Sequence, residues 1–169
     1  DVLIGLLLSD GHLERTSPTS AVRLSVSFGA KHSLYLQHLY DLFEPYANTG
    51  PVSISVTNRK TKTSHEVIKF KTVSLPQLVY YHQLFYVLNS QGKLIKIVPY
   101  NILELMSPVV LAHLIMGDGN LKLPDEIIRI YTNSFTKEEV ELLSLAITNK
   151  LNILSKVAHD RNNQYMITI

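Results

Sequence analysis

The sequence predicts an α+β fold in which one order of elements, helix, strands, helix and strands, occurs twice. Two apolar, helix-like runs, residues 4–11 and 112–119, each end in an Asp-Gly pair. Each run is followed by segments with the two-residue alternation of half-buried strands, and by a segment with helical spacing. We therefore expect a duplicated αββαββ(α) architecture. Residues 1–106 form the predicted first half and residues 107–169 the predicted second half.

The composition is that of a globular protein and restricts the possible functions. The 169 residues suit one compact domain or two small half-domains that share a core. Apolar residues make up 46% of the chain, which excludes general disorder, and the absence of cysteine excludes disulfides and thiolate metal sites. The apolar runs are far shorter than the roughly 20 residues that span a bilayer, so we expect no membrane partner. A net charge of +2 means that any nucleic-acid-binding surface must be local.

The first half contains a predicted strand, a helix, a hairpin and a closing helix. Residues 21–29 alternate between apolar and polar side chains, which predicts a half-buried strand. Residues 52–57 and 66–73 predict a hairpin with a basic tip over 58–64, and residues 76–89 predict a helix that begins with Pro76. Residues 31–46 predict a helix whose apolar face consists of Leu34, Leu39, Leu42, Phe43 and Tyr46.

The second half repeats this order with clear helix-start signals. Ser107 and Pro108 are a favourable N-cap and first-turn pair for the second motif helix. Residues 126–133 predict a strand with Ile128 and Ile130 inward, and residues 136–139 form a capping box that starts a helix to about Leu151. Residues 153–159 and 164–169 predict two more strands. No counterpart of the 76–89 helix follows them, so we expect the second half to be incomplete.

Asp10 and Asp118 are the residues that point most directly to chemistry. A carboxylate at the end of an apolar segment is costly to bury unless it meets a cation or another partner. Two such acids in equivalent positions predict a site for a divalent metal. The alternative is that each Asp-Gly pair only ends a helix and begins a turn.

At these two motifs the sequence resembles the LAGLIDADG homing endonucleases, in particular the two-motif, single-chain type encoded in mitochondrial introns. The aromatic-rich segment 34–46, the segment 105–108 and the segment 133–139 match the same branch. The resemblance covers nearly the whole chain. It implies that the two motif helices pack side by side at a pseudo-two-fold axis. It also implies saddle-shaped antiparallel sheets that lie in the DNA major groove, a monomer with internal pseudo-symmetry, and a mitochondrial location.

The resemblance also implies a catalytic centre. Asp10 and Asp118 are its predicted catalytic acids, and Lys96 is the predicted basic residue beside the scissile phosphate. The predicted metal is Mg²⁺ or Mn²⁺, which suits oxygen ligands and phosphate. Its predicted site consists of Asp10, Asp118, Ser9 and Gly117. The second-half counterpart of Lys96 would lie beyond Ile169.

The same comparison makes expectations about the contact between the motif helices. Gly5 and Ala112 are small enough to permit a close approach. His113 stands where the family motif has its first glycine, so we expect a looser or rearranged contact there.

The outward residues of the strands and the basic turns are the predicted nucleic-acid-binding residues. Hydroxyl, amide and cationic side chains on such a face can read base edges or hold phosphates, although alternation alone is equally typical of a solvated sheet face. Ser53, Ser55 and Thr57 are expected on this outward face as well. The predicted set is Arg23, Ser25, Ser27, Arg59, Lys60, Lys62, Lys69, Lys71, Lys122, Arg129, Tyr131, Asn133, Lys156 and Arg161.

Three functions remain open from the sequence. The first is a site-specific endonuclease of double-stranded DNA that acts at an intron-insertion-type site and depends on metal. The second is an RNA-binding maturase that assists the splicing of a group I intron. The third is an inactive, endonuclease-derived structural protein within a larger ribonucleoprotein such as the mitochondrial ribosome.

Overall fold

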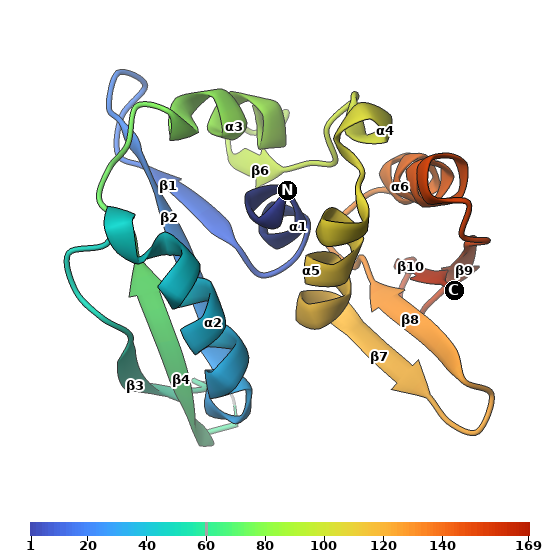
Figure 1. The fold of residues 1–169 in the computed structure, drawn as a ribbon, viewed down its shortest axis with the longest axis horizontal. Helices are drawn as coiled ribbons and strands as arrows, with labels where there is room; N and C mark the ends of the chain where they lie inside the picture. The colour runs from blue at the N-terminus through green and yellow to red at the C-terminus, as the bar shows by residue number, and fades with distance from the viewer. Residues whose placement is uncertain (60) are drawn as a thin grey trace. The chain divides into compact units, whose positions relative to one another are not determined.

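The computed structural model describes residues 1–59 and 61–169. The chain divides into two compact units, drawn together in Figure 1: a first unit of Asp1–Ser9 with Gln83–Ile169, and a second unit of Asp10–His82. These units reflect packing, whereas the predicted halves, 1–106 and 107–169, reflect the repeated sequence. The division into halves therefore stays a prediction.

The second unit is a four-stranded antiparallel sheet with one covering helix. Its elements are β1 (His12–Arg15), β2 (Val22–Gly29), the short 3-10 helix η1 (Ala30–His32), α2 (Ser33–Phe43), η2 (Glu44–Tyr46), β3 (Val52–Thr57) and β4 (Ser64–Lys71). The strand order is β1-β2-β4-β3, and all pairs are antiparallel. This sheet is called the first sheet below.

The first unit contains both motif helices and a second sheet. Its elements are α1 (Val2–Leu8), β5 (Tyr86–Leu88), β6 (Leu94–Lys96), α4 (Ile102–Leu105), α5 (Pro108–Asp118), β7 (Gly119–Lys122), β8 (Ile127–Tyr131), α6 (Lys137–Leu151), β9 (Lys156–His159) and β10 (Tyr165–Thr168). The second sheet has the order β7-β8-β10-β9, and β5 and β6 form a separate hairpin. The remaining helix, α3 (Leu78–Phe85), follows the first sheet in the chain and crosses the division between the units.

The two sheets have the same topology. In each, a motif helix leads into two strands, a helix and two more strands, and the first strand of the later pair lies outermost. This confirms the predicted α+β class and the repeated αββαββ order.

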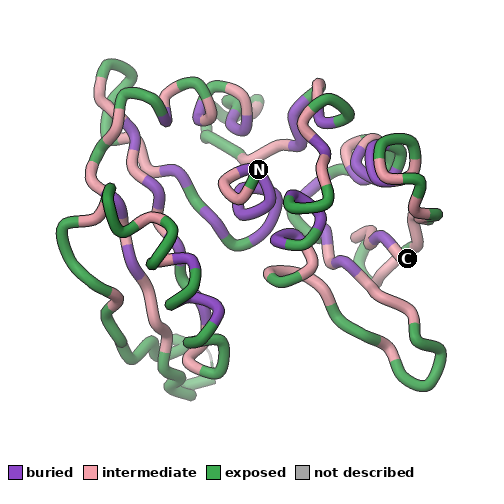
Figure 2. Tube along the Cα trace, in the orientation of Figure 1, coloured by how far each residue is buried: buried purple, intermediate pink, exposed green. Residues whose placement is uncertain are grey.

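The buried side chains follow the alternation of the strands. In β2 the even positions Val22, Leu24 and Val26 are fully buried, as predicted, and in the second sheet Ile130 and Ile167 are fully buried. Figure 2 shows the buried segments running along α1 and the centre of each sheet, with exposed residues at the strand ends and turns. Because α1 is apolar on every side, it is buried on every side from Ile4 to Leu8.

The predicted apolar face of α2 was partly wrong. Leu34 is 87% exposed, whereas Tyr35, Leu36 and Leu39 are the buried residues of this helix. The helix turns this face towards β2 and β4, which it contacts. The helix has two overlapping apolar stripes, one through Leu34 and one through Tyr35 and Leu36, and the prediction chose the stripe that is largely exposed.

The predicted helix over 76–89 was too long. It ends at Phe85, and the chain continues directly into the β5–β6 hairpin, in which Tyr86 lies opposite Lys96. The hairpin loop is held by Asn89, whose side-chain oxygen accepts hydrogen bonds from the backbone N–H groups of Gln91 and Lys93 at 3.0 and 2.9 Å. Gly92 adopts a φ of +71° in this loop. Short strands that follow a helix without a break give no separate periodic signal.

The predicted helix starts are confirmed. The Ser107 hydroxyl accepts a hydrogen bond from the N–H of Val110 at 3.2 Å, and Pro108 lies in the first turn of α5. Thr136 and Glu139 form the predicted capping box of α6, which ends at Leu151.

Within residues 1–59 and 61–169, every helix is too short or too polar to cross a lipid bilayer. One predicted nucleic-acid-binding residue, Lys60, lies outside the described residues.

Candidate functional site

The two motif helices pack directly against each other at Gly5. A Cβ atom placed on Gly5 would lie 2.6 Å from the Cβ of His113 and 2.6 Å from the backbone oxygen of Val110. Both α1 and α5 belong to the first unit, so this contact lies within one packed body. The absence of a side chain at Gly5 is therefore a condition for the approach of the two helices.

This contact corrects two expectations. His113 does not loosen the contact, because its bulk is accommodated opposite Gly5, and its side chain is only 9% exposed. Ala112 does not lie at the contact: it is exposed and lines an apolar cavity of about 590 Å³ between the start of α5 and the end of α6. The helical repeat of 3.6 residues places Val110, His113 and Leu114 on one side of α5 and Ala112 on another.

Ser9 ends α1 and is bound to Lys96. The Ser9 hydroxyl donates to the backbone oxygen of Gly5 at 3.0 Å, and its backbone N–H donates to the oxygen of Leu6 at 3.1 Å, so the last turn is closed. The backbone oxygen of Ser9 accepts a hydrogen bond from Lys96 Nζ at 2.6 Å. A cation at the carboxyl end of a helix is favoured by the helix dipole. Lys96 thus lies at the peptide group that joins Ser9 to Asp10.

Asp118 is the last residue of α5 and is followed by a glycine that the geometry requires. A Cβ atom on Gly119 would lie 2.4 Å from the backbone oxygen of Ile115, which accepts the capping hydrogen bond from the Gly119 N–H. Gly119 also begins β7, opposite Ile130. The Asp-Gly pair therefore places Asp118, which is half-buried, at the junction between the motif helix and its sheet.

Asp10 is exposed and begins the second unit, one residue after the cap of α1. Its charge reaches Tyr35 of α2: burial raises the pKa of the Tyr35 hydroxyl to about 12, and the negative charge of Asp10 adds to this shift. The carboxylate therefore contributes a negative potential at this end of the second unit.

The carboxylates available to a metal are few. Within the described part of the chain, no group of three or more His, Cys, Asp or Glu side chains comes together as a protein-only metal site. Two aspartates would therefore need oxygens from phosphate and water to complete the coordination of a cation. This donor chemistry fits Mg²⁺, which is usually bound by one or two carboxylates together with substrate phosphates and waters.

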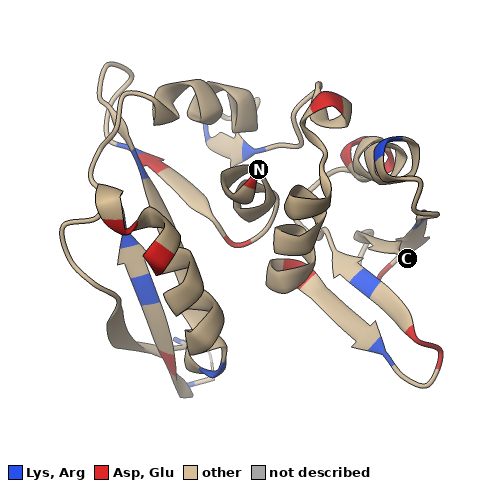
Figure 3. Ribbon diagram, in the orientation of Figure 1, with Lys and Arg blue, Asp and Glu red and all other residues tan. Residues whose placement is uncertain are grey.

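The first sheet brings five of the predicted DNA-binding residues onto one face. Residues directly opposite each other in antiparallel strands share a face. Ser25 lies opposite Lys71, Ser27 lies opposite Lys69, and both pairs point away from the buried positions of β2. Arg23 belongs to the same face. We call this face, opposite the one that α2 covers, the open face; the basic residues of β2 and β4 are marked in Figure 3.

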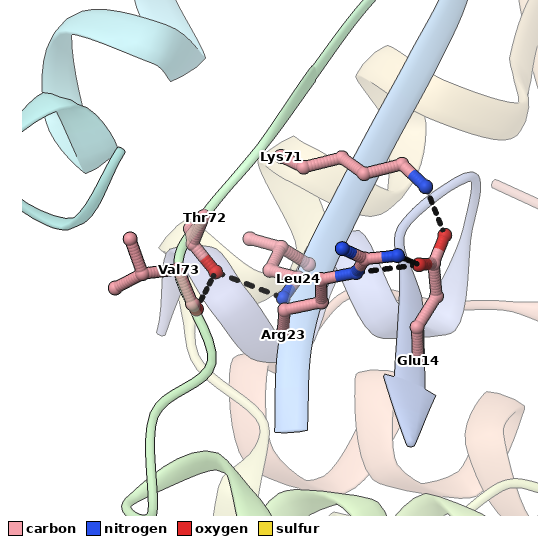
Figure 4. A network of polar contacts seen from close by, with 6 residues as sticks. All are labelled: Glu14, Arg23, Leu24, Lys71, Thr72 and Val73. Atoms are coloured by element: carbon pink, nitrogen blue, oxygen red, sulfur yellow. Dashed lines mark hydrogen bonds and ion pairs between the residues drawn. The ribbon is translucent and has the colours of Figure 1, made fainter. Parts of the chain in front are cut away.

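An acidic residue, Glu14 of β1, links the cations of this open face (Figure 4). Its two carboxylate oxygens accept hydrogen bonds from Arg23 and from Lys71 Nζ, each at 2.7 Å. Burial raises the pKa of the Glu14 carboxyl, but the hydrogen bonds from Lys71 and Arg23 outweigh burial and hold the pKa below its usual value. The Glu14 carboxylate thereby holds Arg23 and Lys71 in fixed positions next to each other.

The buried hydroxyl of Thr72 fixes the end of β4 beside this cluster. It accepts a hydrogen bond from the Leu24 N–H at 3.0 Å and donates to the backbone oxygen of Val73 at 2.9 Å (Figure 4). A polar pocket of about 350 Å³ opens next to it, and its lining includes Arg23, Lys71, Asn48 and Thr49.

The pairing of β3 corrects the predicted face of Ser53, Ser55 and Thr57. Ser53 lies opposite Ile68, on the face that α2 partly covers, whereas Val52 lies opposite Lys69 on the open face. Alternation along a strand divides its residues between two faces, but it does not show which face is covered by the helix and which is open. A one-residue change of register exchanges the two faces.

The second sheet carries an uninterrupted row of polar side chains across all four strands. Asn120, Arg129, Thr168 and Lys156 lie opposite one another in β7, β8, β10 and β9. This polar row lies on the face away from the buried Ile130 and Ile167. Opposite residues in neighbouring strands have side chains about 5 Å apart, so the row is one continuous polar surface.

The remaining predicted residues lie on the second sheet or in turns that adjoin the strands. Tyr131 and Lys122 share the face of the polar row, Lys122 forms an ion pair with Asp125, and Asn133 follows β8 in an exposed turn. Arg59 and Lys62 lie in the turn between β3 and β4, and Arg161 lies in the turn between β9 and β10.

Sequence reasoning missed several residues of the open face and of the polar row. Glu14 and Asn120 belong to the short strands β1 and β7, which were not predicted, and Thr168 was predicted in a strand but without a role. Val52, Ile54 and Val56 were not expected on the open face, because Ser53, Ser55 and Thr57 had been expected there. A sequence signal existed only for Glu14 and Asn120. Glu14 stands four residues after Asp10, and Asn120 stands two residues after Asp118, where the repeated architecture places a first strand.

Comparisons with known proteins agree with this structure. The model of the LAGLIDADG DNA endonuclease family matches residues 1–169. DNA endonuclease I-ChuI from Chlamydomonas applanata is 28% identical over 178 residues, which cover 100% of this chain and 82% of that protein. Cytochrome b mRNA maturase bI2 from Debaryomyces hansenii is 29% identical over 177 residues, which cover 99% of this chain but only 64% of the maturase.

Solved structures show the same fold. The homing endonuclease I-WcaI bound to its DNA recognition sequence matches with a TM-score of 0.85 at 21% identity, over 99% of this chain and 73% of that one. The homing endonuclease I-DmoI with its target DNA in the presence of manganese matches with a TM-score of 0.56 at 15% identity, over 99% and 86% of the two chains. The family match confirms the predicted enzyme class, a DNA endonuclease. By its sequence over its whole length, the chain belongs to the LAGLIDADG DNA endonuclease family.

Proposed function

We propose that this protein is a site-specific endonuclease that hydrolyses phosphodiester bonds of double-stranded DNA with a divalent metal ion, at an intron-insertion-type site. The observation that carries the proposal is the tight packing of α1 on α5 at Gly5, because each of these helices leads into an Asp-Gly pair. The packing accounts for the apolar residues of both motifs and for Gly5, and each motif then ends in an acid.

The open face of the first sheet and the face of the second sheet that carries the polar row are the proposed DNA-binding surfaces. Arg23, Lys69 and Lys71 on the first sheet and Arg129 and Lys156 on the second provide cations for phosphates. Ser25, Ser27, Asn120 and Thr168 lie among these cations on the same faces, where hydroxyl and amide groups can pair with base edges. Cations alone would hold the phosphates but would not distinguish the sequence.

Asp10 and Asp118 are the proposed metal ligands, with Mg²⁺ or Mn²⁺ as the cation and with Ser9 and Gly117 as the residues that position them. A divalent cation bound there would supply a more acidic water and would stabilise the leaving oxygen of an in-line displacement. The closed last turn of α1 and the Gly119 cap restrict the backbone beside each acid. Two carboxylates that share one cation site would repel each other, so cation binding and ionisation of both acids are coupled.

Lys96 is proposed to stabilise charge at the scissile phosphate. Its ammonium group has three donors, and one of them is directed at the Ser9 backbone oxygen. This hydrogen bond holds the cation at the start of the Asp10 segment. A phosphate oxygen bound at this position would be stabilised by the positive charge of the ammonium group.

Selection from a random duplex library followed by cleavage tests this function. The purified chain should enrich one long, asymmetric sequence and should cut it in Mg²⁺ or Mn²⁺ but not in excess EDTA. Glu104→Gln, at an exposed position on α4, is the matched control for acid removal and should cut like the parent protein. Failure to enrich any sequence, or cleavage that persists in EDTA, would contradict the proposal.

The relationship to cytochrome b mRNA maturases supports a second candidate function, assistance of group I intron splicing. This activity would not need the two acids. A splicing assay on the host intron RNA should therefore show equal stimulation by the parent protein and by Asp118→Asn. No stimulation by either protein would exclude the maturase function and leave the endonuclease proposal intact.

We propose further that the protein acts in mitochondria as a monomer with an internal repeat. The cytochrome b names of the yeast relatives support the location, and the two sheets of equal topology support the repeat. A tagged chain should co-fractionate with mitochondria. Light scattering should give the mass of one chain for the free protein and the mass of one chain plus one duplex for the complex with DNA.

A further inference from the structure

The strand β3 exposes three apolar side chains that the core does not use. All six residues of β3 are exposed, which sets this strand apart from β2 and β4 in the same sheet (Figure 2). Val52 is 53%, Ile54 36% and Val56 38% exposed. We call these three residues the β3 apolar row. Since these apolar side chains are not buried in the core, their contiguous exposure points to a binding surface.

The β3 apolar row lies on the open face, with Lys69 at one end and His65 opposite Val56 at the other. Val52 lies directly opposite Lys69, and Ile54 lies opposite Val67, which lies opposite Gly29 in β2. A side chain at Gly29 would meet no atom within 4 Å, so the surface is open on that side of the row. The acidic residue nearest along the pairing, Glu66, lies opposite Ser55 and therefore on the other face of the sheet.

The chemistry of this surface fits the major groove of DNA better than a protein partner. An apolar row beside Lys69, on the same face as Lys71 and Arg23, suits a ligand that presents methyl groups within an anionic frame. In the major groove, the only apolar group on a base edge is the C5-methyl of thymine, and phosphates flank it. The spacing also fits: same-face residues of a strand are about 6.8 Å apart, and base pairs are spaced by about 3.4 Å.

We propose that the β3 apolar row reads thymine methyl groups at alternate base pairs of one arm of the target site. This inference rests on the proposed DNA-binding function and names its specificity at one strand. Val52, Ile54 and Val56 each cover one methyl group, while Lys69 contacts the neighbouring phosphate. Ser53 and Ser55 face away and contribute nothing to sequence preference.

Replacing thymine by uracil tests this assignment without changing the protein. The selected target duplex is synthesised with deoxyuridine for thymidine, first throughout and then at single positions in the arm bound by the first sheet. Each methyl group that is lost at the row should weaken binding about fourfold, because a buried methyl contributes about 0.8 kcal/mol. The sensitive positions should alternate along the arm.

Protein variants connect this effect to β3. In the triple variant Val52→Ala, Ile54→Ala and Val56→Ala, the ratio of the thymine to the uracil dissociation constant should approach one. The matched control, Ser53→Ala with Ser55→Ala on the other face of the strand, should keep the ratio of the parent protein. The single variant Ile54→Ala should lose the preference at one position only, and circular dichroism checks that each variant is folded.

Each outcome decides the proposal. Sensitivity to uracil that disappears in the triple variant supports it. Equal binding of both duplexes by the parent protein, or an unchanged ratio in the triple variant, overturns it and leaves the endonuclease function standing. Self-association of the parent protein that the triple variant abolishes would assign the row to a second copy of the chain and would also overturn it. Absence of binding to any duplex would refute the proposed function itself, and the inference with it.

Discussion

Gly5 is the residue at which a single atom decides the packing of the motif helices. Added to Gly5, a Cβ atom would come within 2.6 Å of both His113 Cβ and the Val110 backbone oxygen. We predict that Gly5→Ala destabilises the protein by about 1–2 kcal/mol, because overpacking costs more than the helical propensity that alanine gains. Thermal unfolding should show a melting temperature lower by about 2–4 °C for each kcal/mol.

Gly29 provides the matched control for this substitution. It has a φ of −58°, and a Cβ atom there would meet nothing within 4 Å. Gly29→Ala should therefore leave the melting temperature unchanged or raise it slightly, by restricting the unfolded chain. If Gly5→Ala were as stable as Gly29→Ala, the close contact between α1 and α5 would be wrong.

Glu14 gives the first sheet a dependence on pH. Its pKa is below the usual value of 4.5 when folded, so the ionised carboxylate favours the folded state. This contribution is complete above about pH 4.5 and is lost as the pH falls through the lowered folded pKa. We predict that Glu14→Gln costs less than about 1 kcal/mol at pH 7, since the ion pairs are partly exposed.

Urea unfolding at pH 7 and pH 3 measures this difference. The stability difference between Glu14→Gln and the parent protein should be smaller at pH 3 than at pH 7, because the contribution of the ionised carboxylate is lost as the pH falls from the unfolded pKa of 4.5 through the lowered folded pKa. Glu104→Gln serves as the control and should differ little from the parent at either pH. An undiminished difference at pH 3 would show that the carboxylate charge of Glu14 is not what holds Arg23 and Lys71.

At the scale of single elements, strong local signals were predictable from the sequence and pairing was not. The capping box at Thr136 and the alternation in β2 are set by neighbouring residues, so both were found. The face of Ser53 depends on which residue of β4 lies opposite it, which is a property of the hairpin. The β5–β6 hairpin was missed for a related reason: Tyr86, Val87 and Leu88 extend the apolar run of α3, and only their pairing with 94–96 distinguishes a strand.

Glu139 joins the start of α6 to the segment before α4. Its carboxylate accepts a hydrogen bond from the Thr136 N–H at 2.7 Å and another from the buried Val98 N–H at 3.1 Å. A buried N–H without a partner is costly. We predict that Glu139→Ala costs about 2 kcal/mol and that Thr136→Ala, which removes only the N-cap acceptor, costs about 1 kcal/mol. Denaturant titration measures both, and a larger loss in Thr136→Ala would contradict the double role of Glu139.

The polar row of the second sheet should dominate the salt dependence of DNA binding by that sheet. Each phosphate contact that is lost lowers the slope of log affinity against log salt concentration by about 1. We predict this change for Arg129→Ala and for Lys156→Ala. Lys150→Ala, on α6 and away from the row, is the matched control and should keep the slope. If Arg129→Ala and Lys156→Ala kept the slope of the parent protein, as Lys150→Ala should, the polar row would not be part of the DNA interface.

At the scale of the whole molecule, duplication made the fold predictable. Two Asp-Gly motifs with the same following order fixed the α+β class and the family before any contact was known. The site was less accessible, because the roles of its residues depend on contacts between distant segments. Lys96 illustrates this: its position in the chain suggested a catalytic base or charge stabiliser, but only the structure shows its hydrogen bond to Ser9.

The most direct measurement of the central claim separates DNA binding from DNA cleavage in the two acid variants. On the selected duplex in Mg²⁺, Asp10→Asn and Asp118→Asn should each bind within a fewfold of the parent protein. Their single-turnover cleavage rates should fall by a factor of at least about 10², since each removes a negative ligand of the catalytic metal. Cleavage at the parental rate by either variant would contradict the claim that this protein is an endonuclease that cuts DNA through a metal held by Asp10 and Asp118.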